Sequence, residues 1–432
     1  MGLARQIRQN VVYRGIFLLF QLINTILISR LAGPIGFGAY ALMIVNANFL
    51  LTVTSLGLPA GILFHASSRD VSKKWLIKIS WVSTLIQVLL IITLEWIIFH
   101  RQGHFFVFNS TDVFNGVAGV LFVATIILSE KYYSLYNGYG YLVNYHRLLA
   151  FMNILLAVSL FVYRHSIQTN GDLVIHLFIL SQVLQLVWMV IGLSRKKITL
   201  QGSVHFNTQS LWKYSFNAFL ANLLYFLLTR VDLWMVQYYH GAEALGLYAL
   251  PIRLVQMALV IPALLSGIVL PSIASGHLED QVYERVLRFL NSFNLALLIP
   301  VAILAPFALP LFFGIAFNSS VVVLLLLLPG AFFLSAQIFL SGYFAGKGLI
   351  RYNLYSMLGG TLLALLLYIS LIPGKGIYGA AIASTLGYGC SFILSYFLYC
   401  RYAGYDWRKC IVNSEDIHWI RKFVKSQFEQ RS

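Results

Sequence analysis

The sequence predicts an all-α integral membrane protein with about twelve transmembrane helices in two six-helix lobes. Hydrophobic residues make up 59% of the 432 positions and charged residues only 10%, and the mean hydropathy is +0.80. Soluble domains carry about a quarter charged residues, so most of this chain must face lipid or other helices. In addition, apolar runs long enough to cross a bilayer recur along the whole chain.

Twelve apolar runs have the length of about twenty residues that a membrane-crossing helix requires. The first is followed directly by further spans and lacks a small-residue cleavage pattern, which indicates a retained helix and not a signal peptide. The runs cover roughly residues 11–31, 39–61, 75–99, 113–134, 148–163, 173–194, 216–239, 247–273, 289–313, 321–345, 352–371 and 377–399.

The basic residues indicate the orientation of these spans, because cytoplasmic loops are enriched in Lys and Arg. With the N-terminus inside, 24 of the 30 Lys and Arg fall on the cytoplasmic side, four on the other side and two within spans. We therefore expect both termini in the cytoplasm. Contact with anionic membrane lipids accounts for the net charge of +16, so no nucleic-acid partner is expected.

The sequence shows no sign of an enzyme, a cofactor or a metal site. The longest polar segment between spans, residues 195–214, is too short to fold as a catalytic domain. The segment 36–38 links two spans instead of a strand and a helix, and 346–348 lacks the spacing of a phosphate-binding loop. The ten histidines are scattered, and the three cysteines fit neither a metal-ligand nor a disulfide pattern.

An internal repeat predicts the two lobes. Gly-Ala-Tyr-Ala-Leu at 38–42 and Gly-Leu-Tyr-Ala-Leu at 246–250 are offset by 208 residues, close to half the chain. Arg30 and Arg230 precede the two copies at different spacings, so this alignment needs a gap. Two parallel six-helix halves are typical of alternating-access transporters with a central cavity. We expect an N-terminal lobe at 1–200, a C-terminal lobe at 201–400 and a cytoplasmic tail at 401–432.

The tail can form one amphipathic helix beside several basic residues. Its apolar face would consist of Ile417, Ile420, Val424 and Phe428. An interfacial anchor and an untethered tail both fit this pattern.

Ionisable residues within the spans point to a cavity, because each costs ~2.5–3.5 kcal/mol at the centre of a membrane helix. Arg230 and Asp232 lie in the seventh span, on different sides of the helix, and Arg253 lies in the eighth. We expect all three to line the central cavity, where guanidinium groups suit a phosphate-bearing substrate. Glu95, near the outer end of the third span, is expected to snorkel toward the interface.

Neutral polar residues extend these positions along helix faces. Asn222 and Tyr225 share the face of Asp232, and Gln256 shares that of Arg253. Asn48 begins a similar stripe in the second span. Such side chains either hydrogen-bond neighbouring helices together or line a wet cavity, and the sequence leaves both interpretations open.

Several segments resemble the Wzx-type polysaccharide flippases of the MOP exporter superfamily. Ile-Ser-Arg-Leu-Ala-Gly-Pro-Ile-Gly-Phe-Gly-Ala-Tyr at 28–40, followed by Gly-Leu-Pro at 57–59, is similar to the start of that family. So are Thr-Arg-Val-Asp at 229–232 and Gly-Ile-Tyr-Gly-Ala-Ala at 376–381. The resemblance runs through about the first 400 residues and implies a MOP/MATE-like fold.

The resemblance also implies a function. A flippase of this kind, in the bacterial or archaeal inner membrane, moves a polyprenyl-pyrophosphate-linked oligosaccharide from the cytoplasmic to the outer leaflet for O-antigen, capsule or exopolysaccharide synthesis. It implies alternating access through a cationic cavity, with coupling to H⁺ or Na⁺ and no other cofactor. The expected partners are the lipid-linked oligosaccharide, membrane lipids and other polysaccharide assembly proteins.

Four charged residues stand at motif positions of that family, namely Arg30, Arg230, Asp232 and Arg253. Arg30 lies near the outer end of its span and belongs either to the substrate site or to an outer gate. Together with the polar stripes, the candidate substrate-binding residues are Arg30, Asn48, Asn222, Tyr225, Arg230, Arg253 and Gln256. Asp232 is the candidate ion-coupling residue.

Three rival functions make different demands on the sequence. A MATE-type multidrug antiporter shares the fold but is expected to favour acidic residues for cationic drugs, whereas the charged candidates here are three arginines and one aspartate. A membrane glycan polymerase or ligase is expected to carry a long charged outer loop, and the longest one here, at 100–112, is short. A scaffold without transport activity would not need charges within its spans.

Overall fold

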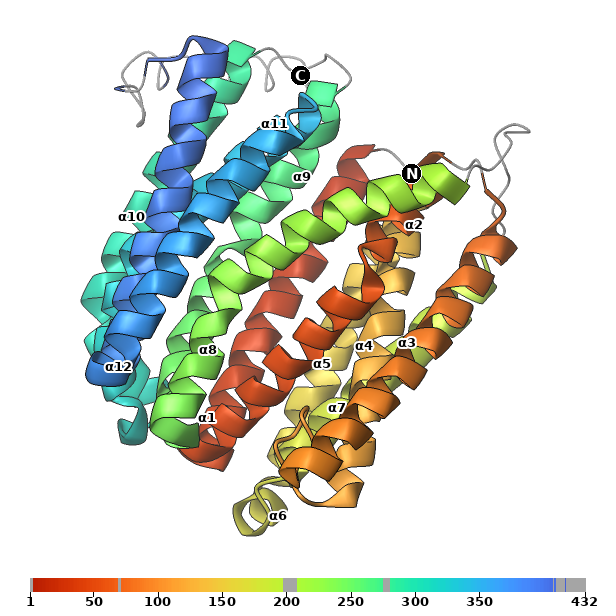
Figure 1. Cartoon of the computed structure of the whole chain (residues 1–432), viewed down its shortest axis with the longest axis vertical. Coiled ribbons are helices and arrows are strands. Elements are labelled where there is room, and N and C mark those ends of the chain that lie inside the picture. Colours follow the sequence, from red (N-terminus) through yellow and green to blue (C-terminus); the bar gives the residue numbers. More distant parts are fainter. Residues whose placement is uncertain are drawn as a thin grey trace. The chain divides into compact units, whose positions relative to one another are not determined.

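The computed structural model in Figure 1 describes residues 3–68, 71–196, 208–274, 280–406, 408 and 416. Within these ranges the chain is almost entirely helical, with a single extended bridge between Phe105 and Ser110. The prediction of an all-α fold is confirmed. The helices are α1 Leu3–Ser55, α2 Leu58–Ser68, α3 Lys73–Gln102, α4 Val113–Gly138, α5 Leu142–Val162, α6 Arg164–Thr169, α7 Leu173–Ser194, α8 Thr208–Ala258, α9 Val260–Ala274, α10 Asp280–Phe313, α11 Ser319–Gly346 and α12 Ile350–Ala403, with a 3₁₀ turn at Ile315–Phe317.

Nine helical segments in the described part of the chain are long and apolar enough to cross a membrane. Three of these segments, in α1, in α8 and α9, and in α12, run for 47, 49 and 54 residues, about twice the length of one crossing. Each contains a glycine with non-helical backbone angles, at Gly33, Gly241 and Gly376 respectively, and the second is also interrupted between α8 and α9. Each therefore supplies two crossings, which agrees with the predicted count of about twelve.

The breaks in α1 and α8 sit at equivalent places of the internal repeat. Gly33 has φ 65° and Gly241 has φ 78°, in the left-handed region that glycine adopts without steric cost. These two glycines are 208 residues apart, as are Gly38 and Gly246. The backbone therefore supports an ungapped repeat at this point, and the gapped alignment that paired Arg30 with Arg230 is wrong.

Gly38 and Gly246 pack directly on one another. A Cβ on Gly38 would overlap the carbonyl oxygen of Ala242, and a Cβ on Gly246 would overlap that of Pro34. Pro34 and Ala242 are also 208 residues apart, so the contact is reciprocal, like an interface about a twofold axis. Only glycine permits this backbone approach. We call it the glycine crossing.

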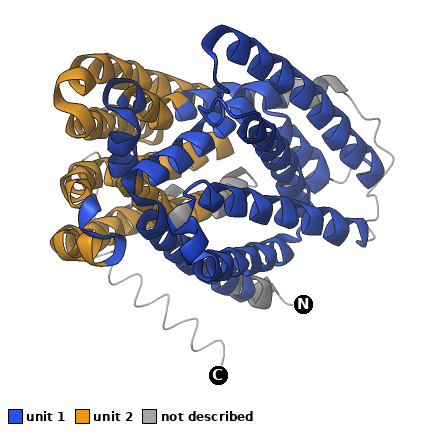
Figure 2. Cartoon of the chain, turned by 90° about the horizontal axis from the view of Figure 1, so that it is seen from below, with its two compact units in different colours: residues 1–226, 236–249, 312–316 blue, residues 227–235, 250–311, 317–432 orange. Residues whose placement is uncertain are grey.

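The chain divides into two compact units, coloured separately in Figure 2. In the first unit, residues such as Leu76, Leu135 and Met189 form an apolar core shared by α3, α4 and α7. In the second, Tyr283 stacks on Phe339 with ring centroids 4.9 Å apart. The first unit comprises residues 1–226, 236–249 and 312–316, and the second comprises 227–235, 250–311 and 317–432.

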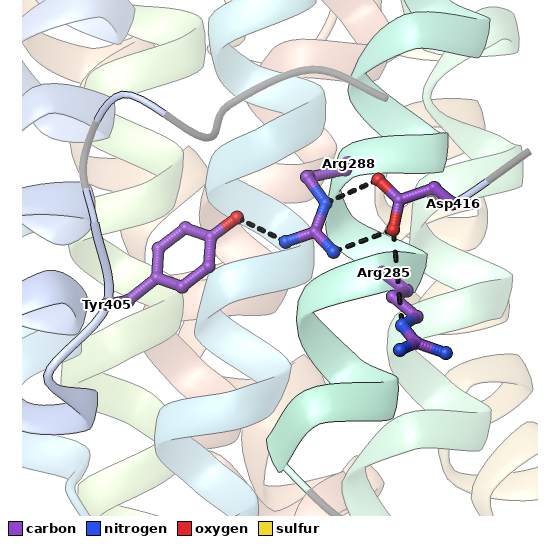
Figure 3. Close-up of polar contacts among 4 residues, drawn as sticks. All are labelled: Arg285, Arg288, Tyr405 and Asp416. Carbon is purple, nitrogen blue, oxygen red and sulfur yellow. Dashed lines mark hydrogen bonds and ion pairs between the residues drawn. The ribbon is translucent and has the colours of Figure 1, made fainter. Parts of the chain in front are cut away.

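A residue of the C-terminal tail is held inside the second unit (Figure 3). Arg288 of α10 donates from Nε and Nη2 to the two carboxylate oxygens of Asp416, each at 2.7 Å, and from Nη1 to the hydroxyl of Tyr405 at 2.8 Å. Arg285 lies 4.0 Å from the same carboxylate. The tail is therefore tethered at Asp416. The four residues of the expected amphipathic face lie outside the described residues.

Glu95 does not snorkel toward the interface as expected. Its side chain is 3% exposed and accepts hydrogen bonds from the backbone N–H groups of Phe106 at 2.7 Å and Val107 at 3.1 Å. Asn46 of α1 donates to the carbonyl of Phe106 at 2.6 Å. Glu95 therefore fixes the loop between α3 and α4 instead of reaching for water.

Replacing Glu95 by Ala should lower the free energy of unfolding by about 2–3 kcal/mol, because it leaves two buried amides without an acceptor. Thermal unfolding of the purified protein measures the loss. Glu243→Ala, at an exposed position of α8, is the matched control and should change stability by less than about 0.5 kcal/mol. Equal stability of the two variants would contradict the role assigned to Glu95.

Candidate functional site

Asp232 is the most deeply buried of the predicted site residues. Its carboxylate is fully buried and accepts from the hydroxyl of Ser384 in α12 at 3.0 Å and from the N–H of Leu233 at 2.9 Å. The hydroxyl of Tyr368 lies 3.0 Å from that of Ser384 and donates to the carbonyl of Leu228. Asp232 therefore belongs to a polar network that joins α8 to α12.

Arg230 and Gln256 lie on opposite sides of the break at Gly241 in α8, and their side chains meet. With the Gln256 amide turned so that its oxygen faces the guanidinium, Oε1 accepts from Arg230 Nη1 and from Nη2, the latter at 3.1 Å. The sequence placed both residues among the candidates but did not pair them.

Among the three predicted arginines, Arg253 is the one whose guanidinium has no recorded partner within the described residues. Its side chain is half-buried, and within the described part of the chain it forms no hydrogen bond or ion pair. It lies three residues before Gln256, which puts the two on one helix face. A half-buried guanidinium of this kind can accept an anionic group without first breaking an internal ion pair.

Asn48 hydrogen-bonds within its own helix. Asn48 donates to the carbonyl of Ile44 at 2.7 Å, within its own helix, and Thr52 in turn donates to the carbonyl of Asn48. Asn222 is exposed and Tyr225 is half-buried. The Asn48 stripe therefore directs its hydrogen bonds along α1.

Arg30 is engaged at a helix end. Its Nε donates to the carbonyl of Phe312 at 2.7 Å, in the last turn of α10. Cationic side chains near a helix C-terminus satisfy the last carbonyls and interact favourably with the helix dipole. Of its two predicted roles, substrate binding and an outer gate, this contact favours the second.

The sequence did not predict two buried polar clusters in the first unit. Lys131 of α4 is fully buried against Ser83, Thr84 and Gln87 of α3. The 24 Lys and Arg assigned to the cytoplasmic side include Lys131, whose side chain is buried in the helix packing instead of facing a loop. A signal for it existed, since it falls inside the predicted span 113–134.

The second cluster joins α1 to α5. Arg14 Nη1 lies 3.1 Å from His146 Nε2, and His146 Nδ1 lies 3.2 Å from the side-chain oxygen of Asn10. Because arginine can only donate, Nε2 must accept, so His146 is neutral with its proton on Nδ1. Arg14 is among the 24 basic residues assigned to the cytoplasmic side, and the sequence does not predict its pairing with His146.

Comparison with known protein families shows the family of this chain. Residues 27–322 match the family model described as polysaccharide biosynthesis protein, which spans more than half of the sequence. The chain belongs to this polysaccharide biosynthesis protein family. The resemblance to polysaccharide flippases is therefore confirmed at the level of the family. No curated protein sequence matches the chain.

Solved structures identify the fold of this polysaccharide biosynthesis protein. It superposes on the lipid II flippase MurJ in an inward closed conformation with TM-score 0.72 and 15% identity, covering 90% of this chain and 87% of that one. A MOP superfamily transporter from Pyrococcus furiosus gives TM-score 0.66 and 14% identity, with coverage of 92% and 95%. The Vibrio cholerae MATE transporter VcmN gives 0.63 and 15%, with coverage of 94% and 98%. The predicted MOP/MATE-like fold is confirmed.

Proposed function

We propose that the protein is a flippase that moves a polyprenyl-pyrophosphate-linked oligosaccharide from the cytoplasmic to the outer leaflet of the inner membrane, with both termini in the cytoplasm. The observation that carries the proposal is the half-buried guanidinium of Arg253, which has no ionic partner among the described residues. Family membership and the MOP fold support it. The product would serve O-antigen, capsule or exopolysaccharide synthesis, alongside other polysaccharide assembly proteins.

The chemistry of the pyrophosphate explains the choice of arginine. Guanidinium keeps its charge and binds phosphate oxygens through two parallel hydrogen bonds. Arg253 would hold the pyrophosphate, and Arg230 would do so from its position against Gln256. The polyprenyl tail would stay in lipid while alternating access carries the head group across. Transport of this kind needs no catalytic step.

Asp232 is the proposed ion-coupling residue. Its buried carboxylate bridges α8 and α12 through Ser384, so binding of H⁺ or Na⁺ there would change how these two helices are joined. No other cofactor is required.

Arg253→Ala tests the proposal. Losing charge-assisted hydrogen bonds worth about 1.5–3 kcal/mol should lower the transport rate at limiting substrate by about 10- to 100-fold. The measurement is flipping of a polyprenyl-pyrophosphate-linked oligosaccharide by the purified protein in liposomes. Arg101→Ala, at the exposed end of α3, is the matched control.

Two outcomes would contradict the proposal. One is equal transport by Arg253→Ala and Arg101→Ala. The other is transport of a cationic dye, but not of the lipid-linked oligosaccharide, by the unmodified protein. The latter result would instead favour the multidrug antiporter.

A further inference from the structure

Lys131 lies in a pocket of oxygen atoms supplied entirely by α3. Its Nζ is 2.8 Å from Ser83 Oγ, Thr84 Oγ1 and Gln87 Oε1 and 3.4 Å from the carbonyl oxygen of Ser80. An ammonium group has three protons, and the three short contacts use all of them. We call these four oxygens the α3 oxygen cluster.

The polar groups of this cluster are oriented to accept. Ser83 donates its hydroxyl proton to the carbonyl of Ile79 at 2.6 Å, and Thr84 donates to that of Ser80 at 2.7 Å. The amide nitrogen of Gln87 donates to the carbonyl of Thr54 in α1 at 2.9 Å, which turns Oε1 toward Nζ. Each side chain has thus committed its donor elsewhere, so the cluster presents lone pairs to whatever occupies its centre.

The positive charge of Lys131 is stabilised by neutral oxygen atoms and not by a carboxylate. In the part of the chain that the structure describes, its ammonium forms no ion pair, and the neighbouring Glu130 is exposed and not among its partners. A lone charge inside a membrane span is costly and marks a functional position. Hydroxyl, amide and carbonyl oxygens around a buried charge are also the ligands that hard cations take.

We propose that the α3 oxygen cluster is a monovalent-cation site whose resident cation is the ammonium of Lys131. The site lies apart from Asp232, in the other unit of the chain. If the protein is a flippase as proposed above, its first unit needs no free Na⁺ at this position, because the chain supplies the charge itself. The occupancy of the site can be measured without transport, so it stands or falls separately from the proposed function.

Lys131→Ala tests the site by emptying it. With Na⁺ as the probe, the variant should bind one Na⁺ per chain more than the unmodified protein, saturably. Its Tm should also rise by more than that of the unmodified protein when NaCl replaces choline chloride at equal ionic strength, since a ligand that binds the folded state stabilises it. Any Na⁺ that Asp232 binds contributes equally to both proteins, so the difference between them reports on the α3 oxygen cluster. Radioactive Na⁺ binding and thermal unfolding of the full-length purified protein provide the two measurements.

Two further variants make the test specific. Lys131→Met fills the cavity with an uncharged chain of similar length, so it should fold without gaining the Na⁺-dependent rise in Tm. Adding Thr84→Val to Lys131→Ala removes one ligand and should abolish the gain. The proposal is overturned if Lys131→Ala shows no Na⁺ response, if it folds in neither salt, or if Lys131→Met responds equally.

Discussion

Replacing Asp416 by Ala should lower the free energy of unfolding by about 3–5 kcal/mol. Arg288 is 7% exposed, and removing its carboxylate partner leaves a buried charge without compensation, which is strongly destabilising. Two of the three hydrogen bonds from Arg288 in Figure 3 disappear at the same time. Thermal unfolding of the purified protein would measure the effect, which originates in the second unit.

A double-mutant cycle separates the pair from its burial cost. Arg288→Met with Asp416→Leu replaces both charges by apolar groups, and such replacements are often neutral or stabilising. The double variant should therefore be more stable than Asp416→Leu alone, and the cycle completed with Arg288→Met should give a coupling energy of about 2–3 kcal/mol. Asp406→Ala, at an exposed position nearby, should cost less than about 1 kcal/mol. If Asp416→Ala is no worse than Asp406→Ala, the tail is not held by this pair.

The spans and the repeat could be predicted because both are written into the local sequence. A run of about twenty apolar residues specifies a crossing wherever it occurs. The glycines at 33 and 241 adopt left-handed backbone conformations that few other residues tolerate, so the breaks fall at the same place in both halves. The equivalence of Arg30 and Arg230 failed because it relied on one residue type and ignored the glycines.

The partners of the polar side chains could not be predicted in the same way. Helical periodicity tells which residues share a face, but not which helix that face meets. Arg30 donates to a carbonyl 282 residues away, and Lys131 meets oxygens of α3 44 to 51 residues before it. Glu95 was misjudged because its acceptor role depends on the backbone of a loop. The candidate residues in α8 could therefore be predicted from the sequence, but the hydrogen-bond network around Asp232 could not.

Replacing Gly246 by Val should cost about 3 kcal/mol or more, at or beyond the upper end of overpacking effects. The obstacle at the glycine crossing is the backbone carbonyl of Pro34, which cannot swing aside as a side chain would. Gly15→Ala is the matched control in α1, since a Cβ there meets nothing within 4 Å. It should raise stability by roughly 0.5–1 kcal/mol, the usual gain for replacing glycine within a helix.

The reciprocity of the crossing makes a sharper expectation for Gly38 and Gly246 together. Each added Cβ is relieved by the same separation of the two backbones, because Gly38 faces Ala242 as Gly246 faces Pro34. Once the first substitution has forced that separation, the second meets less resistance. Gly38→Ala with Gly246→Ala should therefore cost less than the sum of the single variants, by about 0.5–1 kcal/mol or more. Strict additivity, measured by thermal unfolding of the three variants, would show that the two glycines do not share one contact.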